Sequence, residues 1–178
     1  MVTTQRNSNW ETLTTVQKGN IGEKLVQRFL ESKGFICYKP VSDGAHPFDF
    51  LCVKEKRLAI AAEVKTKSLM SKYKATGFDQ RSYEDYKAFA ETHNMMIFIF
   101  FVDEHERKIY GNWLHVLEQK RVEWLKSGEK VIYPLVIPGK KPVRVYPYSA
   151  MKVITDIPTD ICDKLKSLSQ RNYEYRAS

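Results

Sequence analysis

Two carboxylates and a lysine stand beside apolar segments in the first half of the chain. Asp49 lies within the segment 46–50, and Glu63 and Lys65 follow the apolar run 58–62. Charged side chains are rarely fully buried unless they are paired or bound to a metal. Two acids and a lysine at the edge of a core therefore indicate a site rather than a solvated surface.

A β-hairpin would bring these three residues together. The polar stretch 54–57 separates two apolar runs and is typical of a hairpin turn. If the turn centres on Lys56, Asp49 lies opposite Glu63, because each is seven residues from the centre. Side chains alternate faces along a strand, so Glu63 and Lys65 share one face. Opposed residues have Cβ atoms about 4.5–5.5 Å apart, and two carboxylates that close repel each other unless a cation or a proton lies between them.

The chemistry that this group predicts is the binding of a hard divalent cation. Mg²⁺ prefers oxygen ligands, binds through few carboxylates and keeps several of its waters. The alternative for Asp49 and Glu63 is an ion pair with a nearby lysine at the surface, but apolar neighbours such as Phe48 and Phe50 argue against it. The alternative for Lys65 is a contact with the backbone of a nucleic acid.

Composition points toward an anionic partner. The chain has 178 residues, a net charge of +8 and a hydrophobic fraction of 43%, with a pI of about 9.3 and a mean hydropathy of −0.45. This length fits one domain with a sizeable core. Excess lysine and arginine favours polyanions, of which nucleic acid is the commonest. The alternative explanation of the charge is solubility alone.

The cysteines and the N-terminal residues predict a cytoplasmic protein. Cys37, Cys52 and Cys162 are widely separated and form no CxxC pair, so a zinc site of the usual spacing is not expected. Reduced thiols fit the cytoplasm. Residues 1–10 form a polar leader without the apolar centre of a signal peptide, and no apolar run is long enough to cross a membrane.

Hydrophobic periodicity and turn signals predict one mixed α/β domain. The expected helices are 14–33, 80–92, 115–126 and 159–169, and the expected strands are 35–39, 48–53, 58–65, 95–103, 108–113, 133–137 and 143–146. Residues 66–79 are polar and basic, which predicts a mobile loop. The order helix, three strands, helix, strand indicates a mixed central sheet flanked by helices.

Together these residues resemble the PD-(D/E)xK nuclease superfamily, whose members share a restriction-endonuclease-like fold with an αβββαβ core. The matching segments are Gly19–Glu23, His46–Asp49, Glu63–Lys65 and Gln80–Tyr83. The resemblance covers residues 19–103, while residues 104–178 add strands and a C-terminal helix without a counterpart. One residue departs from the pattern, because Phe48 is inserted between the proline and the aspartate of the motif.

The resemblance implies a metal-dependent nuclease that hydrolyses phosphodiester bonds of DNA, an endonuclease more than an exonuclease. Mg²⁺ would be the cofactor, with Mn²⁺ able to replace it. The implied metal ligands are Asp49, Glu63, the carbonyl of Val64 and, from the first helix, Glu23. Lys65 would orient and help deprotonate the attacking water, or stabilise charge on the phosphate. For Glu23 the alternative is an ordinary charge flanking the apolar stripe of its helix.

Further residues are expected to contact the substrate or to support the site. Gln80 and Tyr83 lie one helical turn apart, where they would contact the scissile strand or support Lys65; the alternative is a capping glutamine and a tyrosine at the edge of the core. Gly19 and Gly22 cost about 1 kcal/mol each relative to alanine in a helix, which predicts a close approach of this helix to the sheet or to a phosphate. The expected phosphate-binding rim is Lys67, Lys72, Lys74, Arg81, Tyr83 and Lys87, with a solvated loop as the alternative.

Three other functions fit the same sequence. One is a catalytically silent module that binds nucleic acid, and the intact set of two acids and a lysine argues against it. Another is a protein-interaction subunit without affinity for polyanions. The third is a structure-selective nuclease for branched or RNA-containing substrates, similar to Holliday-junction resolvases, which work as dimers. A homodimer is therefore a further expected assembly, and sequence specificity stays open because no recognition helix is evident.

Overall fold

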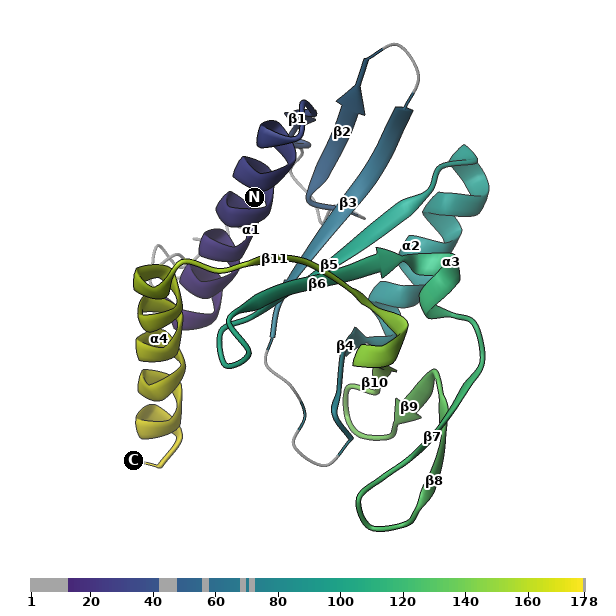
Figure 1. The fold of residues 1–178 in the computed structure, drawn as a ribbon, viewed down its shortest axis with the longest axis vertical. Helices are drawn as coiled ribbons and strands as arrows, with labels where there is room; N and C mark the ends of the chain where they lie inside the picture. The colour runs from purple at the N-terminus through teal and green to yellow at the C-terminus, as the bar shows by residue number, and fades with distance from the viewer. Residues whose placement is uncertain (1–12, 42–47, 56–57, 68–69, 71–72, 178) are drawn as a thin grey trace, which may run out of the picture.

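The computed structural model describes residues 13–41, 48–55, 58–67, 70 and 73–177 (Figure 1). In chain order its elements are α1 (Thr14–Ser32), β1 (Ile36–Tyr38), β2 (Phe50–Lys54), β3 (Leu58–Thr66), β4 (Ala75–Asp79), α2 (Gln80–His93), β5 (Ile97–Asp103), β6 (Lys108–Trp113), α3 (Leu114–Leu117), β7 (Arg121–Trp124), β8 (Lys130–Tyr133), β9 (Leu135–Ile137), β10 (Val143–Pro147), a 3-10 turn (Tyr148–Ala150), β11 (Lys152–Asp156) and α4 (Thr159–Ala177).

The main sheet is mixed, as the order of elements predicts. It has six strands in the order β1-β2-β3-β5-β6-β11. Strands β3 and β5 are parallel, and the other neighbouring pairs are antiparallel. The β2–β3 hairpin pairs Phe50 with Ala62 and Cys52 with Ile60, so its register centres on position 56. The predicted fold class and the predicted register of this hairpin are both confirmed.

The two faces of the main sheet carry separate apolar clusters. Even-numbered residues of β3 pack with α1 and α4 in a cluster that contains Val26, Leu30, Phe50, Cys52, Ile60, Ala62, Val64, Phe100, Val102 and Leu165. The other face packs on α2 and α3 in a cluster that contains Ala61, Phe78, Tyr86, Ile97, Ile99, Phe101, Tyr110, Leu114 and Leu117. Because neighbouring residues of a strand face opposite sides, Glu63 and Lys65 share the α2 side with Ala61.

Helix α1 approaches β3 closely, and a glycine makes this approach feasible. A Cβ added at Gly22 would lie only 1.9 Å from the Oγ1 atom of Thr66, so a side chain there would force Thr66 or the helix to shift. The predicted close approach of the helix to the sheet is thereby confirmed at Gly22, whereas Gly19 has no neighbour within 4 Å. Gly34, with φ of 83°, follows the end of the helix, and the N–H of Phe35 donates back to the carbonyl of Leu30.

Two expected elements are wrong. The expected loop 66–79 contains strand β4, whose residues pair with β10 from Ala75↔Pro147 to Asp79↔Val143. The expected helix 115–126 ends after one turn at Leu117, and β7 follows it. In both places the backbone pairs with residues distant in sequence or across the turn at Gly128, and local periodicity cannot report such pairing. Strand β11, which completes the main sheet beside β6, was also not predicted.

Strands β4, β10 and β9 form a smaller sheet, and the β7–β8 hairpin packs beside it. We call these five strands the second module. Its apolar centre is small and consists of Ala75, Val131, Tyr133 and Val145, with Leu125, Leu135 and other half-buried side chains around it. Figure 1 shows this module below the main sheet, with the β7–β8 hairpin extending away from the main sheet.

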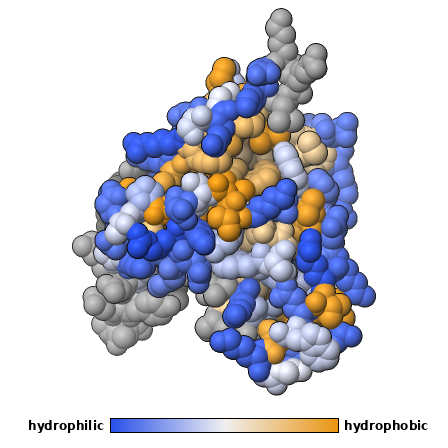
Figure 2. All heavy atoms as spheres, in the orientation of Figure 1, coloured by the Kyte–Doolittle hydropathy of each residue, from blue (hydrophilic) through white to orange (hydrophobic). Residues whose placement is uncertain are grey.

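Part of the main sheet is left uncovered on the α1 side. A groove of about 340 Å³ runs between α1 and β11, and its walls include Phe29, Phe98, Trp113 and Val153. Figure 2 shows apolar side chains gathered in the middle of this face. Among the residues that the structure describes, no helix has the length and apolar character needed to cross a membrane.

Candidate active site

The β2–β3 hairpin holds Asp49 beside Glu63. Asp49 directly precedes β2, and its N–H donates to the carbonyl of Ala62 at 3.1 Å, which extends the pairing of the hairpin by one residue. The N–H of Val64 in turn donates to Oδ2 of Asp49 at 2.7 Å. The carboxylate of Asp49 is therefore anchored to the backbone of β3, immediately next to Glu63.

Glu63 is the second acid of the site, and it is almost completely buried. Its exposed fraction is 5%. Its Oε1 atom accepts a hydrogen bond from the hydroxyl of Tyr86 on α2 at 2.6 Å. The same oxygen pairs with the ammonium of Lys65 at 2.7 Å. A buried carboxylate needs such partners to remain charged, and both of them bind Oε1.

Lys65 lies in an aromatic corner of the same face. Its Nζ atom is 5.6 Å from the ring centre of Tyr86 and 5.9 Å from that of Phe78. An ammonium over aromatic faces is attracted by the negative charge of the rings. These rings and the carboxylate of Glu63 together hold the ammonium close to the two acids.

The two acids repel each other, and the pKa of Asp49 shows it. Burial and then the negative charge of Glu63 raise this pKa to about 7, and the charge of Glu23 adds to the rise. The hydrogen bond from the N–H of Val64 and the charge of Lys65 act in the opposite direction. Near neutral pH the carboxyl of Asp49 therefore holds a proton part of the time, and a bound cation would take the place of that proton.

Tyr86 belongs to the site although the sequence analysis did not single it out. Burial and the neighbouring charge of Glu63 raise the pKa of its phenol, so the hydroxyl keeps its proton and donates to the carboxylate. One signal pointed to this contact. A buried tyrosine hydroxyl usually needs a hydrogen-bond partner, and an acid in the adjacent buried strand can supply it.

Glu23 lies on α1, close enough to Asp49 to raise its pKa. Its own Oε2 atom pairs with the ammonium of Lys39 at 2.6 Å. Helix α1 packs against the face of β3 opposite to Glu63 and Lys65. The role of Glu23 as a further metal ligand therefore stays a prediction.

The residues expected on α2 contact other parts of the molecule. The backbone N–H of Gln80 donates to the carbonyl of Pro142, and its side-chain amide donates to Glu84 at 3.3 Å. The guanidinium of Arg144 lies 4.1 Å from the ring centre of Tyr83. Tyr83 and Lys87 line a pocket of about 350 Å³ between α2 and α3. Their roles at the scissile strand stay predictions.

The expected phosphate-binding rim is described only in part. Lys67, Lys74 and Arg81 are exposed, as a contact with phosphate requires. Lys72 lies outside the described residues. Lys74 closes the segment that leads into β4, and its backbone has a positive φ of 44°. Binding of nucleic acid by this rim stays a prediction.

The donor set of the site suits a hard cation that keeps its own waters. Asp49 and Glu63 supply carboxylate oxygens, which Mg²⁺ prefers over nitrogen or sulfur. Within the described part of the chain, no three side chains of histidine, cysteine, aspartate or glutamate converge as a ready-made metal site. Asp49 and Glu63 are thus the two neighbouring carboxylates that could hold such a cation here.

Comparison with known proteins identifies the fold. No family model and no curated protein sequence matches the chain. The structure is similar to the Holliday junction resolvase Hjc from the archaeal hyperthermophile Archaeoglobus fulgidus, with a TM-score of 0.51 and 14% identity over 81% of this chain and 99% of the resolvase. It also matches D212, a nuclease from a fusselovirus, with a TM-score of 0.47 and 13% identity over 90% of this chain and 96% of that one. The likeness to the resolvase, together with the order of the elements, gives the restriction-endonuclease-like fold.

Proposed function

We propose that this protein is a metal-dependent nuclease of the PD-(D/E)xK type that hydrolyses phosphodiester bonds in DNA. One observation supports this most directly. Asp49, Glu63 and Lys65 meet at one place on the α2 side of the hairpin, with Lys65 2.7 Å from Glu63 and Glu63 close enough to raise the pKa of Asp49. Two acids and one ammonium group thus lie close together, and the chain shares its fold with a Holliday junction resolvase; both observations support the proposal.

The chemistry of the proposed reaction follows from these groups. When bound, Mg²⁺ polarises a phosphoryl oxygen and lowers the pKa of a coordinated water. Asp49 and Glu63 would hold the ion, with the carbonyl of Val64 and, from α1, Glu23 as further ligands. Both described partners of Glu63 bind Oε1, which leaves Oε2 for the ion. Lys65 would orient the attacking water and stabilise the charge that develops on the phosphate.

A junction-resolving activity is the second candidate, and the fold match supports it. The match spans 99% of the archaeal resolvase, so the whole of that chain has a structural counterpart here. A homodimer belongs to this candidate, because a four-way junction presents two strands for symmetric cleavage. Comparing cleavage of a four-way junction with that of a linear duplex, and measuring the mass of the protein in solution, separate the two candidates.

The test of the proposed function is cleavage of DNA with and without a divalent metal. Supercoiled plasmid, linear duplex and single-stranded DNA are incubated with the protein in Mg²⁺, in Mn²⁺ and in EDTA. We expect cleavage in both metals and none in EDTA. Cleavage of no DNA form in either metal, by a protein that still binds DNA, would support the catalytically silent module instead.

A further inference from the structure

The β7–β8 hairpin exposes an apolar face that the fold does not use. Val122 pairs with Ile132, and Trp124 pairs with Lys130. All four side chains lie on the side of the hairpin away from the apolar centre of the second module, and the exposed fractions of Val122, Trp124 and Ile132 are 49%, 70% and 47%. We call these four residues the outer face. Exposed apolar side chains that cluster in this way mark a binding surface more often than those that occur singly.

The inner face of the same hairpin anchors it firmly. Val131 and Tyr133 are 6% and 1% exposed, and they pack on Ala75 and Val145. The hydroxyl of Tyr133 donates to the carbonyl of Tyr73 at 2.9 Å. The hairpin is therefore held by its inner face, and stability of the fold does not explain the outer face.

The chain segment that carries the outer face is basic, with Lys130 on the outer face itself and Lys126 in the turn of the hairpin. Between residues 120 and 141 the basic residues outnumber the acidic ones by six to two, and the basic ones are Lys120, Arg121, Lys126, Lys130, Lys140 and Lys141. The five lysines are exposed. An exposed tryptophan among lysines is complementary to a nucleic acid, because lysines attract the phosphates and the indole ring stacks on bases.

We infer that the outer face of the β7–β8 hairpin binds a nucleic-acid strand and that Trp124 stacks on an unpaired base. This inference rests on the proposed function and names its substrate class, DNA with unpaired bases. In an intact duplex the bases are already stacked on each other, so an indole ring finds a free base only in a single strand, a fork or an open junction.

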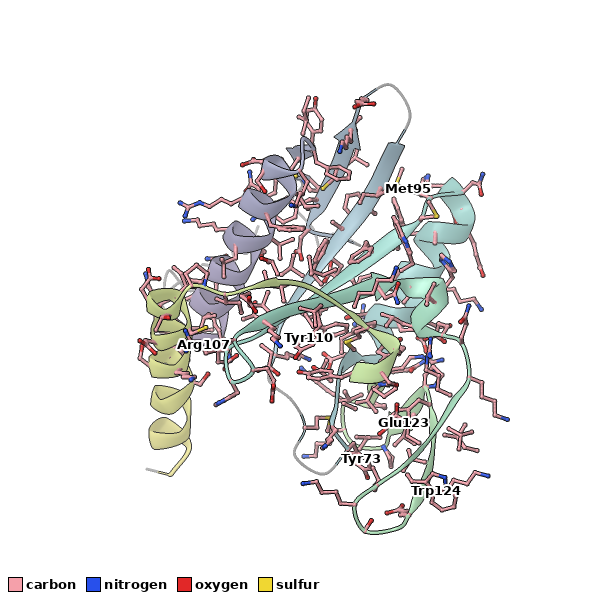
Figure 3. The ribbon with its side chains drawn as sticks, in the orientation of Figure 1. Tyr73, Met95, Arg107, Tyr110, Glu123 and Trp124 are labelled. Atoms are coloured by element: carbon pink, nitrogen blue, oxygen red, sulfur yellow. The ribbon has the colours of Figure 1, made fainter. Side chains whose placement is uncertain are left out.

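The position of the hairpin connects it to the candidate active site. Tyr133 bonds to Tyr73, which lies in the segment that joins β3, with Glu63 and Lys65, to β4. Figure 3 shows Tyr73 and Glu123 nearer to the main sheet and Trp124 farther out on the hairpin. A DNA strand stacked on Trp124 would thus be held by the second module, and this module follows directly in the chain after β3, which carries Glu63 and Lys65.

The experiment compares binding of two DNA molecules by three variants in EDTA, where cleavage is absent. The DNAs are a fork with single-stranded arms and a blunt duplex of the same length. The variants are Trp124→Ala, Trp124→Phe and the matched control Tyr38→Ala, which removes an aromatic ring of 55% exposure from β1. We expect Trp124→Ala to weaken binding of the fork about tenfold, Trp124→Phe to weaken it less, and neither to change binding of the duplex by more than about twofold.

Each other outcome overturns the inference. Wild-type affinity of Trp124→Ala for the fork shows that the ring makes no contact, and an equal loss on fork and duplex shows a contact that is not stacking. If Trp124→Ala instead changes the mass of the protein in solution, the outer face is an interface between copies of this chain. If the wild-type protein binds neither DNA, the inference fails, and the cleavage test in Mg²⁺ and Mn²⁺ decides the proposed function separately.

Discussion

The two β-hairpins of this protein place charged and apolar side chains in opposite ways. In the β2–β3 hairpin the charged Glu63 is 5% exposed, whereas in the β7–β8 hairpin the apolar Trp124 is 70% exposed. Each arrangement costs stability, because buried charge loses hydration and exposed apolar surface orders water. Both hairpins therefore contain residues that folding alone does not explain, and we assign chemistry to the first and substrate contact to the second.

The largest expected effect is on the buried acid of the first hairpin. Glu63→Gln keeps the size of the side chain but removes the charge that pairs with Lys65 and that would hold the metal ion. We expect plasmid cleavage in Mg²⁺ to fall by about 100-fold or more. Glu55→Gln, at the exposed turn of the same hairpin, serves as the control and should cleave like the wild type. Full activity of Glu63→Gln would move the active site elsewhere.

A smaller effect is expected from the hydroxyl that orients Glu63. Tyr86→Phe removes the hydrogen bond to Oε1 and leaves the ring under Lys65 in place. We expect kcat to fall about tenfold with little change in KM for DNA, and half-maximal activity to need more Mg²⁺. Tyr110→Phe on β6, which removes a tyrosine hydroxyl with no role proposed at the site, is the matched control. Unchanged kcat and an unchanged Mg²⁺ requirement in Tyr86→Phe would limit Tyr86 to a packing role.

The first hairpin should also make stability depend on pH. The pKa of Asp49 is about 7 in the folded protein, against 3.8 without the fold, so the folded state binds more protons between these values. The contribution of Asp49 to the free energy of unfolding is therefore fully present below about pH 4 and is lost as the pH rises through about 7. In EDTA at pH 8, Asp49→Asn should therefore raise Tm by a few degrees, with no gain at pH 4.

The exposed Asp85→Asn on α2 provides the comparison for this measurement. It should leave the difference in Tm between pH 4 and pH 8 as it is in the wild type. A pH profile of Asp49→Asn that coincides with the wild-type profile would show that burial and the charge of Glu63 do not raise the pKa of Asp49 in the folded protein.

The smallest effect is expected from the outer face of the second hairpin. Val122→Ala should change the free energy of unfolding by less than about 0.5 kcal/mol, because the side chain is half exposed. Val131→Ala on the inner face should cost about 1–3 kcal/mol, because it leaves a cavity in the small apolar centre. Urea unfolding of both variants measures the difference, and equal costs would mean that the outer face also supports the fold.

Local patterns were enough to predict the first hairpin and its site. The polar turn between two apolar runs sets the register, and alternation along β3 places Glu63 and Lys65 on one face, as the structure confirms. The contact of Tyr86 with Glu63 was not predicted, since it joins a helix to a strand that lies 23 residues earlier in the chain. Hydrophobic periodicity orients each element but does not match one element to another.

The second module shows the same limit more strongly. Strand β4 pairs with β10, more than sixty residues later, and its sequence alone resembles a polar loop. The segment after Leu117 was expected to continue as a helix, but it forms strand β7. Glu123 on the inner side of β7 accepts a hydrogen bond from the hydroxyl of Ser149. In both segments the partner decides the conformation, because a strand is stable only when its backbone groups are paired.

The sequence by itself determined how two acids and a lysine are spaced on either side of the β2–β3 turn. It also determined the order of the core elements and the excess of positive charge. Each of these depends on residues close together in the chain or on composition. Only the tertiary structure decided that Tyr86 meets Glu63, that residues 75–79 form a strand, and that Trp124 stands on an exposed face. These features depend on distant segments packing together, and the free energy of such packing resides in the contacts between them.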